Sequence, residues 1–260
     1  MDEITILPKE ANESGREYAY RVLRENIITF KLRPGEILNE NAMADMLSSS
    51  RTPVREALFT LRKENMVEVR PQSSSIVSLI DLNLLRQGIM MQVMVELEML
   101  RTLGGSLDNA WIKRLRDNLR LQKDAVASTE KTRHYLRLDD EFHRLIYTAA
   151  RKENLYRVTK TLSSQLDRVR YLLLMEGKIE NRSGFEEHKD ILVRLIAGVR
   201  EGLAELYIRH RMGVEKHIPH IAGKYPDYFK AFHWEDNRMA KLAGIIKRSE
   251  EREASRIWVL

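Results

Sequence analysis

The chain of 260 residues contains no cysteine, only 6 prolines and no long apolar run. Without cysteine it can form neither a disulfide nor a thiolate metal site, and it has no cysteine nucleophile. Its apolar stretches are shorter than the ~18–20 residues that a membrane-spanning helix needs. The acidic Asp2 and Glu3 do not fit the basic-then-apolar pattern of a signal peptide. We therefore expect a cytoplasmic protein without a membrane partner.

The composition is that of a folded chain with one or two domains. Charged residues make up 32% and apolar residues 43% of the sequence, which is typical of globular proteins. The net charge of +6 favours an anionic partner only weakly, and residues 1–80 carry 11 Lys/Arg against 12 Asp/Glu, a net of −1. Any DNA-binding function must therefore depend on the local placement of arginines rather than on bulk charge.

The second half of the chain is free of proline from Leu82 to Pro219. Apolar patterns with a period of 3.6 residues follow one another there, without strand-like alternation. They predict helices near residues 82–103, 106–128, 131–150, 153–176, 184–198 and 200–222. The glycines at 104–105 and 177 and the stretch 181–184 are the expected breaks. The prediction is an all-α bundle of six to seven helices.

The first half has a different pattern. Ser14 and Glu17 have the spacing of a capping box and predict the start of a helix that runs to about Phe30. A compact amphipathic helix is expected over Glu40–Leu47. Asn65 is a plausible left-handed terminator of the helix after it. Two short strands, 66–69 and 76–79, should then flank a polar loop at 70–75 and form a β-wing.

The segment 48–59 is the most informative part of this half, because it reads as a polar turn followed by a helix with exposed arginines. Thr52 is suited to the N-cap and Pro53 to the first helical position. The predicted core stripe of this helix is Val54, Leu58 and Leu61. Arg51 and Arg55 lie away from that stripe, so the layout is that of a helix-turn-helix.

The run Ser50-Arg-Thr-Pro-Val-Arg-Glu-Ala-Leu58, preceded by Glu36-Ile-Leu-Asn-Glu and Ala44-Asp-Met-Leu47, resembles the winged-helix domain of the GntR family of bacterial transcription regulators. The resemblance implies that a homodimer binds double-stranded, near-palindromic operator DNA. Arg51 and Arg55 would contact bases or phosphates, and the hydroxyls of Ser50 and Thr52 would contact phosphates. Two departures are the glycine-less wing and Ser48 in place of the usual turn glycine.

Four polar residues of the second half form a possible metal-binding set. Asp139 and His143 are separated by four residues and therefore share one helix face. His188 and His210 lie on two later predicted helices. One carboxylate and three imidazoles that project into a bundle core would bind a divalent cation such as zinc, nickel or manganese. Spacing alone leaves open that these histidines lie on half-buried helix faces and are satisfied by their neighbours.

The pattern Leu138-Asp-Asp-Glu-Phe-His143, followed by Asn154, Glu187-His188, Ile191, Gly198 and His210, resembles the FCD ligand-binding domain of the FadR branch of GntR regulators. The resemblance implies that Asp139, His143, His188 and His210 bind a divalent metal, which helps to hold a small carboxylate effector. His217 is the rival of His210 if the last helix is shifted by two turns. His134 and His220 are expected to be ordinary histidines on half-buried helix faces, satisfied by their neighbours.

The effector-binding residues are less clearly indicated. Gln92 stands where many members of the family carry an arginine, in the pattern Gln92…Glu96. That arginine is thought to bind the effector carboxylate, so its absence weakens a simple organic-acid assignment. Arg168 or Arg170 could replace it, although arginines on helix surfaces are common.

These observations together predict a mainly α protein of four segments. Residues 1–13 would form a flexible arm, 14–80 the winged helix-turn-helix domain, 81–223 the FCD-like helical domain, and 224–260 a helical extension with an amphipathic helix near 235–252. The expected function is a ligand-responsive, sequence-specific transcriptional regulator, with repression favoured over activation. One alternative is a metal-dependent hydrolase or lyase with an appended DNA-binding module. Another is a metal-free fatty-acyl sensor.

Overall fold

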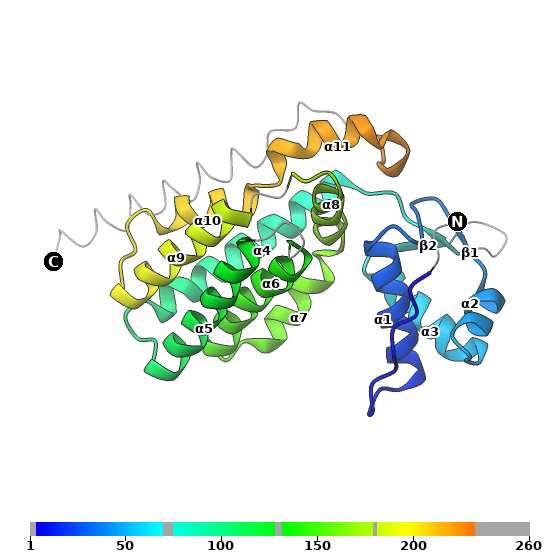
Figure 1. The fold of residues 1–260 in the computed structure, drawn as a ribbon, viewed down its shortest axis with the longest axis horizontal. Helices are drawn as coiled ribbons and strands as arrows, with labels where there is room; N and C mark the ends of the chain where they lie inside the picture. The colour runs from blue at the N-terminus through cyan, green and yellow to red at the C-terminus, as the bar shows by residue number, and fades with distance from the viewer. Residues whose placement is uncertain (1–3, 70–74, 128–131, 179–180, 232–260) are drawn as a thin grey trace. The chain divides into compact units, whose positions relative to one another are not determined.

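The computed structural model describes residues 4–69, 75–127, 132–178 and 181–231, which form two compact units (Figure 1). The winged-helix unit contains the described residues of 1–85, 160–173 and 217–231. The helical unit contains those of 86–159 and 174–216. The predicted fold class is confirmed, because a three-stranded sheet accompanies helices in the first unit and the second unit is helical.

The winged-helix unit begins with α1 (Gly15–Ile28), which starts at the predicted capping box. The Ser14 hydroxyl accepts a hydrogen bond from the Glu17 backbone N–H, and the Glu17 carboxylate accepts one from the Ser14 N–H. These reciprocal bonds satisfy two donors that a helix start otherwise leaves without a partner. The buried face of α1 packs against α3. It consists of Ala19, Val22, Leu23, Asn26 and Ile27.

Two further helices complete the helix-turn-helix, α2 (Glu40–Met46) and α3 (Arg51–Lys63). The prediction that Thr52 is the N-cap is wrong, because the N-cap position belongs to Ser50 and the helix begins at Arg51. Pro53 is therefore the third helical residue rather than the first. It is tolerated there because the first four N–H groups of a helix have no intrahelical acceptor.

The wing is a small antiparallel sheet of order β1-β3-β2. Its strands are β1 (Ile37–Leu38), β2 (Val67–Val69) and β3 (Ser75–Val77), and β1 was not predicted. Asn65 adopts the expected left-handed conformation, with φ of 57°, between α3 and β2. The wing-loop residues 70–74 lie outside the described residues, so the consequence of the missing wing glycine stays a prediction.

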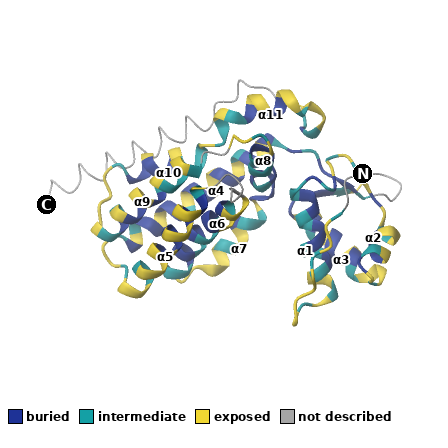
Figure 2. Cartoon of the chain, in the orientation of Figure 1, coloured by how far each residue is buried: buried dark blue, intermediate teal, exposed yellow. Residues whose placement is uncertain are grey.

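The helical unit is a bundle whose helices alternate buried and exposed faces (Figure 2). Helix α5 packs against α6 and α9, and α9 packs against α10. None of the helices in the described ranges has the length and apolarity that crossing a membrane requires. The helices are α4 (Leu82–Leu103, which begins in the winged-helix unit), α5 (Asn109–Val126), α6 (Thr132–Ala149), α7 (Glu153–Thr161, which ends in the winged-helix unit), α9 (Asn181–Ala197) and α10 (Leu203–Met212).

Three predicted helix boundaries differ from the structure. The helix expected at 153–176 is divided into α7 and α8 (Ser164–Met175), at a point with neither glycine nor proline. Gly184 was expected in a break but lies inside α9, where a Cβ atom would collide with the Tyr135 hydroxyl. The helix expected at 200–222 is divided: α10 ends at Met212 with Gly213 as its C-cap, and Pro219 lies in the first turn of a later helix. A 3₁₀ turn (Glu215–His217) and α11 (Ile218–Lys224) follow.

A strap at residues 225–230 follows α11 within the winged-helix unit. It contains a 3₁₀ turn (Pro226–Tyr228), and its Phe229 forms a parallel bridge with Ile80. The Ile80 N–H donates to Tyr228 O at 2.8 Å, and the Lys230 N–H donates to Ile80 O at 2.9 Å. The Tyr228 ring stacks on Phe30 with a centroid distance of 5.3 Å. The amphipathic helix expected near 235–252 lies outside the described residues.

The strap should contribute to the stability of the winged-helix unit. Phe229 is only 6% exposed, so Phe229→Ala is expected to lower the free energy of unfolding by about 2–4 kcal/mol, through lost burial and the cavity left behind. Urea unfolding followed by circular dichroism measures this change. Lys224→Ala, at an exposed position of the preceding helix, is the control. An unchanged urea midpoint for Phe229→Ala would show that the strap contributes nothing to this core.

Candidate functional sites

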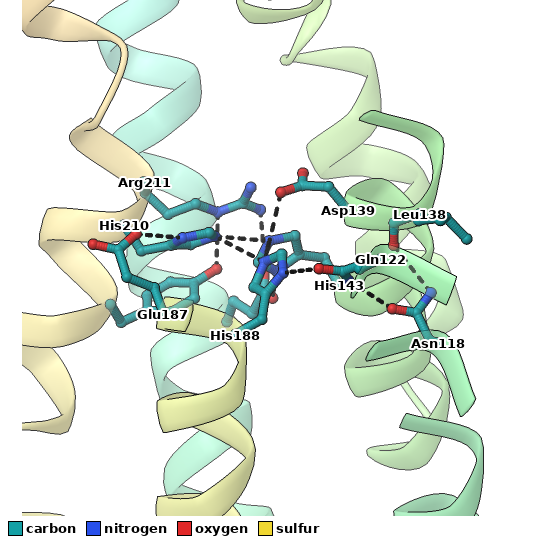
Figure 3. Close-up of polar contacts among 11 residues, drawn as sticks. Asn118, Gln122, Leu138, Asp139, His143, Glu187, His188, His210 and Arg211 are labelled. Carbon is teal, nitrogen blue, oxygen red and sulfur yellow. Dashed lines mark hydrogen bonds and ion pairs between the residues drawn. The ribbon is translucent and has the colours of Figure 1, made fainter. Parts of the chain in front are cut away.

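The four residues predicted to bind a metal converge in the core of the helical unit (Figure 3). Asp139 and His143 come from α6, His188 from α9 and His210 from α10. One potential ligand atom of each residue lies within 4.8 Å of those of the other three. Three of the residues are buried and the His210 side chain is 6% exposed, so the cluster is largely shielded from water.

The three imidazoles direct their Nε2 atoms at a common point. These nitrogens are separated by 3.2 Å for His143 and His210, 3.3 Å for His143 and His188, and 3.1 Å for His188 and His210. The Asp139 Oδ1 atom lies 3.5 Å from His188 Nε2. Ligands about 2.0–2.1 Å from a tetrahedral zinc ion are about 3.3 Å apart. The spacing therefore fits donors around one small cation.

The opposite nitrogen of each ring faces a hydrogen-bond acceptor. His143 Nδ1 contacts a carboxylate oxygen of Glu96, His188 Nδ1 lies 2.8 Å from Gln122 Oε1, and His210 Nδ1 lies 3.1 Å from Glu187 Oε2. An acceptor at Nδ1 favours the tautomer that carries its proton there, which leaves the Nε2 lone pair for the centre of the cluster. This orientation is what a metal ligand requires.

A second layer of hydrogen bonds fixes the Gln122 amide. Its Nε2 group donates to Asn118 Oδ1 at 2.7 Å, and Asn118 Nδ2 donates to the Leu138 carbonyl at 3.0 Å (Figure 3). This chain connects α5 with the turn of α6 that carries Asp139. The amide oxygen of Gln122 is thereby directed toward His188. Such outer hydrogen bonds orient metal ligands and raise their affinity for the ion.

Burial sets the protonation states of the cluster. It lowers the pKa of His143, with a further lowering by Arg211, and it lowers the pKa of His188 well below the usual value, helped by His210. Both rings are therefore neutral near pH 7. Burial alone would raise the pKa of Glu96, but His143 and Arg211 lower it to about 2. The Arg211 Nη2 group lies 3.1 Å from Glu96 Oε2 and keeps this buried carboxylate paired.

The second candidate site is the solvent-facing side of α3. Val54, Ala57, Leu58 and Leu61 are its buried face. The Arg51 and Arg55 side chains are 61% and 65% exposed, and both lie near Glu40 of α2, with nitrogen–oxygen distances of 3.8 and 3.1 Å. Ser50 at the N-cap makes no side-chain capping bond. Two arginines beside the N-terminus of an exposed helix provide donors for phosphates and base edges.

Two family models match the chain over these two sites. Residues 16–77 match the bacterial regulatory proteins of the gntR family, and residues 89–212 match the FCD domain. The chain belongs to the GntR family and carries an FCD domain. These families consist of transcription regulators rather than enzymes, so the hydrolase or lyase alternative is not supported.

Individual GntR relatives agree with this assignment. An HTH-type transcriptional regulator of Streptomyces ambofaciens is 32% identical over 83% of this chain and 90% of its own length. The Escherichia coli transcriptional repressor RspR is 25% identical over 81% of the chain and 91% of its own length. The E. coli McbR structure covers 82% of the chain and 99% of its own length, with a TM-score of 0.66 and 21% identity. A GntR-type regulator of Rhodococcus sp. RHA1 shares the fold with a TM-score of 0.63 and 20% identity, over 82% and 100% of the two chains.

The remaining histidines of this GntR protein lie outside the cluster. His217 ends the 3₁₀ turn before α11, so the rival assignment with His217 in place of His210 does not match the geometry. His134 and His220 also lie outside it, as expected, although both are exposed rather than half-buried.

The residues predicted to bind the effector are separated in this FCD protein. Gln92 is buried on α4, one turn before Glu96. Arg168 is fully buried, but its Nη2 group donates to Ser78 O at 2.6 Å within the winged-helix unit. Arg170 is half-buried on the same helix as Arg168. Of these three residues, only Gln92 lies on a helix that contacts a metal-ligand candidate, because Glu96 of the same helix α4 contacts His143.

Sequence reasoning missed the residues that orient the imidazoles. Glu96 was noted only as part of a pattern with Gln92, and neither Gln122 nor Glu187 was selected. Glu187 precedes His188, and Arg211 follows His210, so adjacency to a ligand candidate was an available signal for both. Gln122 lies on α5, far from any ligand in the sequence, and carried no such signal.

Proposed function

We propose that this GntR regulator is a ligand-responsive, sequence-specific DNA-binding protein whose FCD domain binds one divalent metal and a small carboxylate effector. The observation that carries the metal assignment is the convergence of three Nε2 atoms, each on a ring whose Nδ1 faces an acceptor. Without a cation, three neutral imidazoles would have their lone pairs directed at one another. Asp139, His143, His188 and His210 would hold the ion.

The donor set limits the choice of metal and of effector. Three imidazoles and one carboxylate suit zinc, nickel or manganese. A dication bound by one carboxylate and three neutral imidazoles keeps one positive charge and supplies a Lewis-acidic site that attracts an anion. The nearby Glu96 carboxylate is already balanced by Arg211 at 3.1 Å. A small organic acid is therefore the class of effector that the charges favour.

DNA reading is assigned to α3. Arg51 and Arg55 would contact guanine edges or phosphates, since the guanidinium fork matches both bidentately. Ser50 and Thr52 at the helix start would donate to phosphate oxygens. We propose repression as the mode of regulation, supported by the similarity to RspR, which is a transcriptional repressor.

A homodimer is the assembly that this function requires. Each winged helix reads one half-site, and two-fold proteins match near-palindromic operators. Apolar side chains are exposed at Met90, Met91 and Met94 on α4 and at Leu155 and Val158 on α7. Exposed apolar stripes of this kind are candidates for subunit contacts.

Sedimentation and DNA selection test this function together. At micromolar concentration the protein should sediment at twice 30.5 kDa, or about 61 kDa. It should select a near-palindromic duplex from a random-sequence library, with one dimer bound per duplex. Met94→Glu is expected to weaken the dimer, because it would place a charge in the apolar contact. A chain that stays monomeric in the presence of its selected duplex, or that selects none, would contradict the proposal.

A further inference from the structure

Helix α8 belongs by sequence to the FCD domain but packs in the winged-helix unit. The FCD match covers residues 89–212, whereas residues 160–173 group with the winged helix. In sequence this segment lies between the metal-ligand candidates of α6 and that of α9. Both of its ends therefore continue directly into the metal-bearing unit.

The first residues of α8 bind the C-terminal end of α3. The Ser164 hydroxyl donates to the Glu64 carbonyl at 2.6 Å, and Gln165 Nε2 donates to the Asn65 carbonyl at 2.9 Å. Glu64 is the C-cap of α3, and Asn65 is the left-handed residue after it. The last carbonyls of a helix lack intrahelical donors, and Ser164 supplies one to the Glu64 carbonyl. The Asn65 carbonyl accepts from Gln165 and also from the Ser78 hydroxyl, at 2.6 Å.

An ion-pair network reinforces the same contact. Asp167 Oδ2 lies 2.6 Å from Arg24 Nη2, and Arg24 Nε lies 3.3 Å from Glu64 Oε2. The Tyr20 hydroxyl donates to Glu64 Oε1 at 2.5 Å, and Lys160 Nζ lies 3.3 Å from Asp167 Oδ1. The side chains of Glu64 and Asp167 are 8% and 11% exposed. Charges this well shielded interact strongly, so the network links α1, α3 and α8.

Helix α8 also binds the segment that connects β3 of the wing with α4. Arg168 Nη2 donates to the Ser78 carbonyl at 2.6 Å, just after β3. The Asp81 N–H donates to Gln165 Oε1 at 3.2 Å, just before α4. One face of α8 thus binds both the end of the recognition helix and the segment that leaves the wing.

We propose that α8 positions the recognition helix for operator binding, with Ser164 and Asp167 as positioning residues that do not contact DNA. The inference rests on the proposed role of α3 as the DNA reader. Helix α3 has 13 residues and is therefore about 20 Å long, so a 5° tilt about its C-terminal end moves Arg51 by about 2 Å. Hydrogen bonds to base edges do not tolerate such a shift. A rearrangement of the metal-bearing unit that moved α8 would thereby change operator affinity.

The experiment compares full-length variants on a duplex that the wild-type protein selects from a random-sequence library. Fluorescence anisotropy gives the dissociation constants, and hydrogen–deuterium exchange of the amides at residues 61–66 reports on the end of α3. Asp167→Asn is expected to weaken binding about tenfold, and Ser164→Ala about three- to tenfold. Both should accelerate exchange at the end of α3. Asp167→Glu keeps the carboxylate and should restore most of the affinity.

The matched control is Glu215→Gln, which breaks the Arg86–Glu215 ion pair within the helical unit. That pair is similarly shielded, with side chains 15% and 19% exposed, and it does not contact α3. Its loss should leave DNA binding unchanged. The proposal is overturned if Asp167→Asn and Ser164→Ala bind as tightly as wild type, or if Glu215→Gln loses equal affinity. If wild type selects no duplex, the proposed function fails, whereas unchanged exchange at 61–66 in the variants overturns the role of α8.

Discussion

His188→Ala is expected to abolish metal binding and the thermal stabilisation that the metal provides. His188 is fully buried, and its Nε2 lies within 3.3 Å of those of both other imidazoles, so its loss removes the central donor. An ion at 100 to 1,000 times its dissociation constant stabilises the folded chain by about 3–4 kcal/mol. The wild-type melting temperature should therefore fall by roughly 5–15 °C on chelation. Elemental analysis of untagged protein should find about one divalent ion per wild-type chain.

The quantity to compare is the difference in melting temperature with added zinc and with chelator, because His188→Ala also leaves a cavity. That difference should vanish in His188→Ala and persist in His134→Ala and His220→Ala, whose side chains are exposed. It should also shrink in acid, at a pH well below the usual imidazole pKa of about 6.5, because burial lowers the pKa of His143 and His188 and so delays the competition of protons with the metal. Wild-type protein that contains no ion and does not respond to zinc or nickel would favour the metal-free sensor.

Arg51→Ala is expected to weaken operator binding about 5- to 150-fold, which corresponds to about 1–3 kcal/mol. The Arg51 side chain is 61% exposed and lies at the N-terminal end of α3, so its removal should leave the melting temperature nearly unchanged. A gel-shift titration on the selected duplex measures the effect. Discrimination against substituted base pairs should fall at one position of each half-site if Arg51 contacts a base.

Arg120→Ala is the control for the charge change, because Arg120 is 74% exposed on α5. It should bind the duplex like wild type. A phosphate contact by Arg51 would instead weaken all duplexes equally and reduce the salt dependence of binding. If Arg51→Ala binds with wild-type affinity, α3 is not the DNA-reading helix.

Local sequence determined much of the fold. The capping box at Ser14, the apolar stripe of α3 and the left-handed Asn65 each depend on interactions within a few residues, so the pattern predicted them. Asp139 and His143 were expected on one helix face for the same reason. The grouping of these two with the histidines of α9 and α10 came from the resemblance to the FCD domain, because spacing alone left the cluster undecided.

Tertiary structure alone decided which elements meet. Periodicity identifies the apolar face of a helix but not the helix that covers it. The acceptors Glu96, Gln122 and Glu187 therefore emerged only when α4, α5 and α9 were packed around the cluster. No glycine or proline lies between α7 and α8, so the sequence gives no local signal for the break between them. Helix α8 begins at Ser164, whose hydroxyl binds the end of α3. Contacts between residues a hundred positions apart set this boundary, and no local pattern carries that information.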